Sequence, residues 1–314
     1  MVKTIKNRMV NYKKIKSARV TVGILLPPYI SNTSTNIKAY LDPTYIKWLS
    51  RAKAAVVPIM YNISKVKMRE YLSQVNGILL TGGGIDNKIS HSRKQFLEYQ
   101  NSLIYIMRYA KKQNDIKHYY PIWATCMSFQ LLAVLEIKKR LKRRNDKLLD
   151  NIPQFGLDNL YMKADLKHSR LGKIFSKKQI DMLRDNKSTY HKHFKSFYLN
   201  NEIIQQLKPK INIIATNKDD KKRDYLSIYE YKDYPFYAVL FHPEYPLVSK
   251  RRESLNVKRK EMLLLSDKLG KFFIDECKKN KNVVRTIHNK SINRYPVYEF
   301  TRKNKYNRVY YFKN

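Results

Sequence analysis

The segment that decides the fold reads Tyr120-Pro121-Ile122-Trp123-Ala124-Thr125-Cys126-Met127-Ser128-Phe129. A short apolar run ends abruptly at Cys126, and an amphipathic segment begins directly after it. This pattern is typical of a buried strand that turns tightly into a helix and lifts a nucleophile out of the sheet. A second apolar run ends much later in the chain, at His242-Pro243-Glu244. The two stretches together make a covalent hydrolase the leading hypothesis.

Strands and helices alternate around this segment. Short apolar runs predict buried strands over 20–26, 54–59, 77–80 and 120–125, and the first of them is rich in β-branched residues. Helical spacing of apolar residues predicts helices over 43–52, 65–75, 92–112 and from 127 onward. Such alternation at short spacing forms right-handed βαβ units. We therefore expect an α/β fold, a mostly parallel sheet with helices on both faces.

The second half of the chain is less regular. Residues 138–187 are basic and lack a strong apolar period, and we interpret them as insertions around the sheet. Three strands close enough to pair as an antiparallel edge are predicted over 211–216, 225–229 and 235–241, and an amphipathic helix over 257–278. We divide the chain into a basic N-terminal arm (1–18), a catalytic domain (19–280) and a basic, tyrosine-rich tail (281–314).

The net charge is extreme, since 64 Lys and Arg face 25 Asp and Glu, which gives +39. A polyanionic partner would explain this excess, but so would an A/T-rich coding bias, and the cations are scattered rather than gathered in one motif. The charge therefore informs on partners and not on the fold. A nucleic-acid partner is conceivable but not favoured, and a homodimer is left open.

Other sequence features narrow the class of protein. The two cysteines, Cys126 and Cys277, are too few for a disulfide framework or a zinc site, so we expect no metal. No apolar stretch reaches the roughly 18–20 residues of a membrane span. The basic N-terminus is not followed by the apolar region of a secretory signal, so an intracellular location is favoured over a secreted or vacuolar one.

Cys126 needs help to act as a nucleophile. A thiol attacks as the thiolate, and a free cysteine with a pKa of about 8.5 is mostly protonated at neutral pH. A helix that begins directly after Cys126 favours the anion, and His242 is the best candidate for the base. On a continuing strand, Glu244 would lie on the same side as His242 and could orient its ring.

A tetrahedral intermediate also needs hydrogen-bond donors for its oxyanion. The glycines after the strand at 77–80 can approach a carbonyl closely because they lack a Cβ, so Gly83 and Gly84 are candidate donors. The amide of Met127, next to the nucleophile, is a further candidate. A Gly-Gly-Gly alone is more often an ordinary turn, but ligands of open α/β sheets bind at the carboxyl ends of strands, where all three stretches fall.

With these segments in place, the chain resembles γ-glutamyl hydrolases, which belong to the class I glutamine amidotransferase-like superfamily. The resemblance covers roughly residues 20 to 280. It is carried, in chain order, by 22–25, 45–49, 56–59, 76–84, 120–126, 168–170, 190–192 and 234–244.

The resemblance implies a flavodoxin-like, three-layer architecture and a set of active-site residues. It implies Cys126 as nucleophile, His242 as base and Glu244 as its partner, and it adds His191 as an auxiliary active-site residue. The implied reaction cleaves γ-linked glutamates from folyl polyglutamates, which are small polyanionic substrates, through an acyl-enzyme. No metal or cofactor is implied.

The chain departs from the family pattern at three positions. Ala124 and Ser128 stand where the family has glycines two positions before and after the nucleophile, and Tyr245 stands where lysine often follows His-Pro-Glu. Because a sharp turn packs its neighbours against backbone, we expect the two larger residues to add strain or shift the thiol.

Two alternative functions stay open at this point. One is a glutaminase-type amidotransferase subunit, which would need a synthase partner. The other is a catalytically impaired homologue that binds polyanions through its charge, because the Lys, Arg and Tyr of its ends alternate cations with stacking rings.

Overall fold

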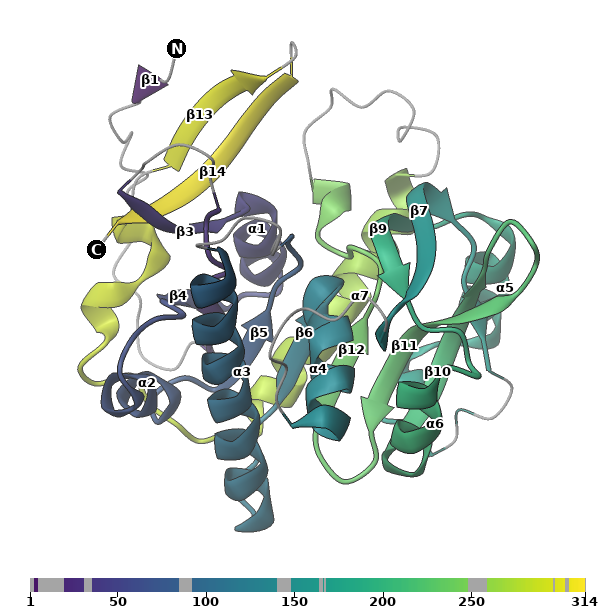
Figure 1. Cartoon of the computed structure of the whole chain (residues 1–314), viewed down its shortest axis with the longest axis horizontal. Coiled ribbons are helices and arrows are strands. Elements are labelled where there is room, and N and C mark those ends of the chain that lie inside the picture. The colour runs from purple at the N-terminus through teal and green to yellow at the C-terminus, as the bar shows by residue number, and fades with distance from the viewer. Residues whose placement is uncertain are drawn as a thin grey trace.

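The computed structural model describes residues 3–4, 20–30, 36–84, 92–139, 148–163, 166, 168–247, 259–295, 297–302 and 305–313. Its centre is an eight-stranded sheet with the strand order β4-β2-β5-β6-β12-β11-β10-β8 (Figure 1). The strands are β2 (Thr21–Leu25), β4 (Ala55–Ile59), β5 (Gly77–Leu80), β6 (Ile122–Thr125), β8 (Tyr161–Met162), β10 (Ile211–Lys218), β11 (Asp224–Tyr231) and β12 (Phe236–Val239).

The sheet is parallel over one part and antiparallel over the other. The strands from β4 to β12 pair in parallel, and β11, β10 and β8 continue the sheet by antiparallel pairing. This arrangement confirms both the mostly parallel sheet and the antiparallel edge expected from the sequence. In the β6–β12 pair, Val239 lies opposite Thr125. The residues that follow these two strands therefore emerge side by side.

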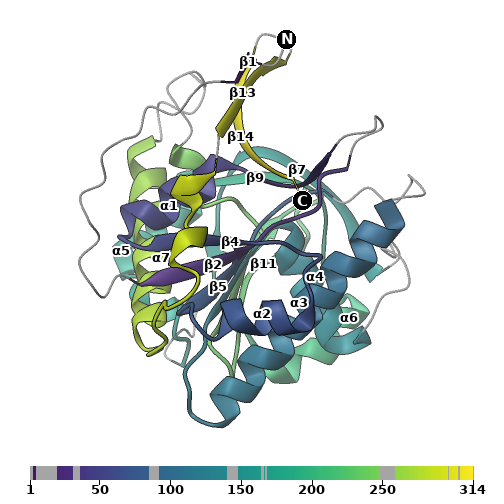
Figure 2. The ribbon, with the colours of Figure 1, turned by 90° about the vertical axis from the view of Figure 1, so that its left-hand side faces the viewer.

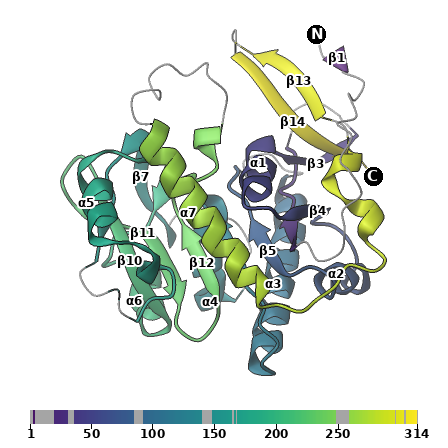
Figure 3. The same ribbon diagram turned by 180° about the vertical axis from the view of Figure 1, so that it is seen from behind.

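Helices cover both faces of the sheet (Figures 2 and 3). One face carries α1 (Pro43–Arg51), α5 (Lys177–Asp185) and α7 (Arg259–Lys278), and the other carries α2 (Lys65–Leu72), α3 (Ser92–Asp115), α4 (Met127–Lys138) and α6 (Glu202–Leu207). The helices expected from apolar spacing are all present, with ends shifted by a few residues. Among the described helices, none combines the length and apolarity that a membrane crossing requires.

Local chemistry explains how α1 braces the central strand β6. The Asp42 side chain accepts a hydrogen bond from the Thr44 amide (2.9 Å), and Pro43 occupies the first turn, where its missing N–H costs nothing. The helix buries Trp48, whose ring lies 5.3 Å from that of Trp123 in β6. The indole N–H of Trp48 donates to the carbonyl of Ser266 in α7 (2.8 Å). Strand β6 is thereby fixed against two helices.

Several strands lie where the sequence predicted loops or insertions. The stretch between β2 and α1, where no strand was predicted, contains β3 (Ile37–Leu41). The basic middle (138–187) contains β7 (Asp150–Asp158), which pairs with β9 (Thr189–Ser196) just beyond it in a two-stranded ribbon. One face of the ribbon is exposed and carries both apolar and charged residues, which hides the alternating pattern of a half-buried strand.

The C-terminal residues extend a second sheet. Strands β13 (Val297–Arg302) and β14 (Lys305–Lys313) join β1 (Lys3–Thr4) and β3 in the order β1-β13-β14-β3. This small sheet rises above the main one at its carboxyl edge (Figure 2). Residues 5–18 of the predicted N-terminal arm lie outside the described residues. The division into arm, domain and tail stays a prediction, and the β14–β3 pairing joins the tail to the domain.

The tight packing between β5 and α7 can be tested at Gly77. A Cβ on Gly77 would lie 2.6 Å from the sulfur of Cys277 and 3.2 Å from the carbonyl oxygen of Pro121. We expect Gly77→Ala to lower the free energy of unfolding by about 1–3 kcal/mol, measured by chemical denaturation. Val66→Ala, at an exposed position, is the control and should change it by less than about 0.5 kcal/mol. Equal stability of the two variants would contradict this packing.

Candidate active site

Cys126 lies at the tight turn between β6 and α4 and has an unusual backbone conformation. Its φ of 51° and ψ of −104° are unfavourable for a residue with a side chain, at a cost of about 1–3 kcal/mol, so neighbouring groups must hold it. Its amide donates to the carbonyl of Val239 (2.9 Å), and its carbonyl accepts from the amide of Gln130 (3.2 Å). This is the geometry of a nucleophile elbow, as the sequence predicted.

The two residues that replace the expected glycines fit the elbow. Ala124 and Ser128 are both fully buried. The Ser128 hydroxyl donates to the carbonyl of Thr81 (2.6 Å), and the Tyr99 hydroxyl is 3.3 Å away. The serine therefore ties the start of α4 to the loop after β5, a contact that glycine cannot make.

His242 and Glu244 form a buried pair beside the elbow. The Nδ1 atom of His242 lies 2.7 Å from Oε1 of Glu244, which leaves Nε2 for Cys126. The expectation that both residues lie on a strand is wrong, because β12 ends at Val239 and the pair lies in the turn that follows. The turn itself brings them together, as the Tyr245 amide donates to the carbonyl of His242 (3.2 Å).

The electrostatics of this pair favour a protonated imidazole. Burial alone would lower the pKa of His242, but the Glu244 carboxylate and the neighbouring Cys126 outweigh it and raise this pKa well above its ordinary value. An imidazolium is the form that donates a proton to a leaving amine. The pair can therefore serve as base and acid in turn.

Two tyrosine hydroxyls hold the glycine loop after β5. The Gly82 amide donates to the Tyr45 hydroxyl (2.8 Å), and the Gly84 amide donates to the Tyr40 hydroxyl. Burial raises the pKa of Tyr40 to about 12, so its hydroxyl stays neutral. Of the expected oxyanion donors, Gly84 thus already has an acceptor. The amides of Gly83 and Met127 therefore stay the candidate oxyanion donors.

His191 lies on β9 and is fully buried. Its Nε2 is 3.0 Å from the Thr189 hydroxyl, and its Nδ1 is 3.2 Å from Nε2 of His193. The other ring nitrogen of His193, Nδ1, lies 3.0 Å from the carbonyl oxygen of Ile152. Burial and the nearby His193 and His242 lower the pKa of His191 well below its ordinary value, and burial lowers that of His193 to about 4. Both rings are neutral parts of one hydrogen-bonded chain.

The structure thus places His191 next to the predicted triad without a direct bond to it. Among the described residues, no hydrogen bond joins His191 to Cys126 or His242. The influence that links the two rings runs from His242, whose charge helps to lower the pKa of His191. His193 was missed by sequence reasoning, and its only signal was its position two residues from His191 on one face of a strand.

The edge of β9 closes the site from the other side. The Tyr190 carbonyl accepts from the His242 amide (2.8 Å), and the Lys192 carbonyl lies 3.8 Å from Sγ of Cys126. Tyr245 stacks on the ring of Tyr190 at 4.5 Å and meets the His242 ring edge-on at 5.0 Å. The tyrosine at the family's lysine position therefore packs against the His242 imidazole. Sequence reasoning found none of these β9 contacts.

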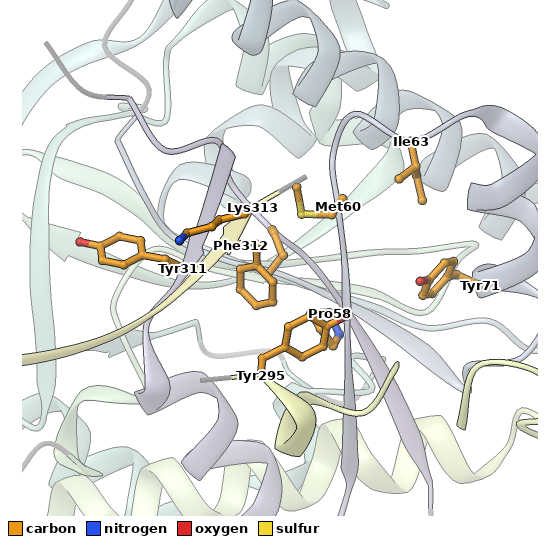
Figure 4. Close-up of a pocket in the computed structure, with 9 residues that line it drawn as sticks. Pro58, Met60, Ile63, Tyr71, Tyr295, Tyr311, Phe312 and Lys313 are labelled. Atoms are coloured by element: carbon orange, nitrogen blue, oxygen red, sulfur yellow. The ribbon is translucent and has the colours of Figure 1, made fainter. Parts of the chain in front are cut away.

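The described residues also line a cavity away from the Cys126 turn. A cavity of about 270 Å³ lies between the end of β4 and strand β14, lined by Leu26, Pro58, Met60, Ile63, Tyr71, Tyr295, Tyr311, Phe312 and Lys313 (Figure 4). It contains none of the predicted catalytic side chains. No group of three or more His, Cys, Asp or Glu among the described residues is arranged to hold a metal ion.

Fold and site together define an α/β protein in which a strained cysteine turn faces a His–Glu pair, the arrangement of enzymes that hydrolyse by acyl transfer. The model of the Peptidase C26 family matches residues 29–244. The chain belongs to the Peptidase C26 family, and it is a hydrolytic enzyme.

Similar proteins cover most of the chain. "Gamma-glutamyl hydrolase B" of Dictyostelium discoideum is 28% identical over 87% of this chain and 76% of its own length. "Gamma-glutamyl hydrolase" of Rattus norvegicus is 28% identical over 84% of this chain and 79% of its own, and that of Homo sapiens 26% over 83% and 78%. A solved structure of a putative GMP synthase subunit from Thermoplasma acidophilum is 14% identical, covers 83% of this chain and 96% of its own, and has a TM-score of 0.46.

The close approach of Gly82 to His242 and Cys126 gives one test. A Cβ on Gly82 would lie 2.8 Å from Cε1 of His242 and 3.2 Å from Cβ of Cys126, whereas one on Gly84 would meet nothing within 4 Å. We expect Gly82→Ala to push His242 and Cys126 apart and to lower kcat by about 100-fold, since misplacements near 1 Å have effects of that size. Gly84→Ala is the matched control and should keep most of the activity. Similar rates for both variants would refute this placement.

The origin of the raised His242 pKa gives another test. Glu244→Gln keeps the shape of the side chain but removes the charge that raises the pKa of His242, so this pKa should fall. It is measured by NMR titration of the imidazole, assigned with a His242→Asn variant. We also expect kcat to fall by about 100-fold or more. An unchanged His242 pKa would show that Glu244 does not set it.

Proposed function

We propose that this enzyme cleaves the γ-glutamyl bonds of folyl poly-γ-glutamates through an acyl-enzyme on Cys126. The observation that carries the proposal is the strained Cys126 turn with the His242–Glu244 pair 2.7 Å apart beside it. The names of the similar proteins, all γ-glutamyl hydrolases, support the substrate class. The net charge of +39 suits a substrate that carries several carboxylates.

In the first half of the reaction, Sγ of Cys126 attacks the γ-carbonyl carbon, and its proton resides on Nε2 of His242. The negative charge that develops on the carbonyl oxygen is met by the amides of Gly83 and Met127. Collapse of the tetrahedral intermediate breaks the C–N bond, and His242 gives its proton to the leaving amine. The glutamate that carries this amine departs, and the rest of the substrate stays as a thioester.

In the second half, water replaces the amine. His242, now neutral, takes a proton from the water, and the hydroxide attacks the thioester carbon. The C–S bond then breaks, the acid product leaves, and the proton on His242 is again available to the cysteine. Glu244 holds the ring through Nδ1 in both halves, so that Nε2 always faces the sulfur.

The tyrosines act before any substrate is bound. The Tyr45 hydroxyl accepts a hydrogen bond from the Gly82 amide, and the Tyr40 hydroxyl accepts one from the Gly84 amide. Because both neighbours are held, the backbone of Gly83 has little conformational freedom. Gly83 then presents its amide without reorganisation at the moment of reaction, which is the condition for strong electrostatic stabilisation. Burial and the nearby Glu244 raise the pKa of Tyr45, so this hydroxyl also stays neutral.

The two cysteines allow a matched test. Cys126→Ala should abolish glutamate release from a pteroyl-γ-polyglutamate, followed by chromatography of the products. Cys277→Ala is the control and should keep the activity, because Cys277 is buried under the sheet and its thiol pKa is raised by that burial. Release by the folded Cys126→Ala variant at the wild-type rate would refute the nucleophile. Turnover of glutamine without cleavage of the polyglutamate would support a glutaminase instead.

A further inference from the structure

The outward face of the β7–β9 ribbon has an unusual composition. Burial alternates along β9, so His191 and His193 face inward while Tyr190, Lys192 and Phe194 face outward. Three large side chains, two of them aromatic, therefore lie in a row on one face. None of the side chains predicted to be catalytic lies on this face.

Two exposed phenylalanines on this face touch each other. Phe155 of β7 and Phe194 of β9 are 55% and 65% exposed, and their rings meet edge to face with centroids 4.9 Å apart. Single apolar residues are common on protein surfaces, but two exposed rings in contact form a larger apolar surface. We call these two rings the aromatic platform; a ligand that covers it would remove this apolar surface from water. Phe155 lies directly opposite Lys192 in the strand register, so a cation borders the platform.

The platform is continuous with the active site. The carbonyl of Lys192 lies 3.8 Å from Sγ of Cys126, and Phe155 is one strand spacing from Lys192, about 5 Å. On the same face, Tyr190 stacks on Tyr245, which contacts the ring of His242. Aromatic surface thus extends from the catalytic imidazole along the ribbon.

The side chain of Lys192 is available to an anion. It is exposed, and no ion pair of Lys192 occurs in the part of the chain that the structure describes. An ammonium group beside two rings matches a ligand that combines a planar aromatic group with a carboxylate. In a γ-linked substrate, the glutamate under attack offers an α-carboxylate, and its α-nitrogen can carry an aryl-acyl group.

We propose that Phe155, Phe194 and Lys192 form a subsite for the acyl side of the substrate. The two rings stack on a planar aryl group joined to the α-nitrogen of the glutamate under attack, and Lys192 pairs with its α-carboxylate. The proposal rests on the proposed function, because it takes the scissile γ-carbonyl to lie at Cys126. It makes the ribbon the part of the enzyme that distinguishes aryl-capped γ-glutamyl chains from uncapped ones.

The test compares two substrates that share the scissile bond, pteroyl-γ-triglutamate and the γ-linked triglutamate without a ring. In the double variant Phe155→Ser/Phe194→Ser, the ratio of kcat/KM for the capped over the uncapped substrate should fall about tenfold. Phe155→Tyr/Phe194→Tyr keeps the rings and should keep the ratio. Leu264→Ser, at a 56% exposed position on α7, is the matched surface control and should keep it too.

Two results would overturn the proposal. An equal loss on both substrates would mean that the rings support the site without contacting the aryl group, and an unchanged ratio would mean that nothing stacks there. If the wild type cleaves neither substrate, the proposed function fails by itself. The subsite is then judged by calorimetric binding of pteroylglutamate to wild type and double variant, where weaker binding by the variant supports it and equal binding refutes it.

Discussion

The structure of the site depends on one pairing, the parallel register of β6 and β12. Because Thr125 and Val239 lie opposite each other, Cys126 and the turn that holds His242 leave the sheet at the same edge. The bond from the Cys126 amide to the Val239 carbonyl continues this ladder into the elbow itself. The same interaction that extends the sheet therefore helps to hold the cysteine in its unfavourable conformation, and a shift of register would separate Cys126 from His242.

Neighbouring elements then limit each group of the site to one position. The hydroxyls of Tyr40 and Tyr45 hold the glycine loop, and the Ser128 hydroxyl joins that loop to α4. On the other side, the carbonyl of Tyr190 in β9 accepts a hydrogen bond from the His242 amide. Backbone groups make many of these contacts, so the surrounding side chains can vary while the geometry persists. That is consistent with relatives that share just over a quarter of their residues with this chain.

The parallel core and the cysteine turn could be predicted from the sequence because buried strands read as continuous apolar runs and the turn interrupts one abruptly. The contact of His242 with Glu244 was expected for the wrong reason, since a turn and not a strand brings them together. The β7–β9 ribbon could not be predicted because its exposed face carries phenylalanines beside lysine. The tyrosine clamps of the glycine loop depend on distant pairings that leave no local pattern.

The pairing of β3 with β14 has a consequence for the glycine loop after β5. Tyr40 lies opposite Tyr311 in this pair, and the ring of Tyr29 lies 6.3 Å from Tyr40 and 5.1 Å from Tyr311. Contacts between residues so far apart in the sequence close a long loop and therefore have an entropic cost, which the packing around them must offset. The Tyr40 hydroxyl that holds the Gly84 amide therefore lies on a strand whose partner is the last strand of the chain, so the order of the glycine loop depends on residues at both ends of the sequence.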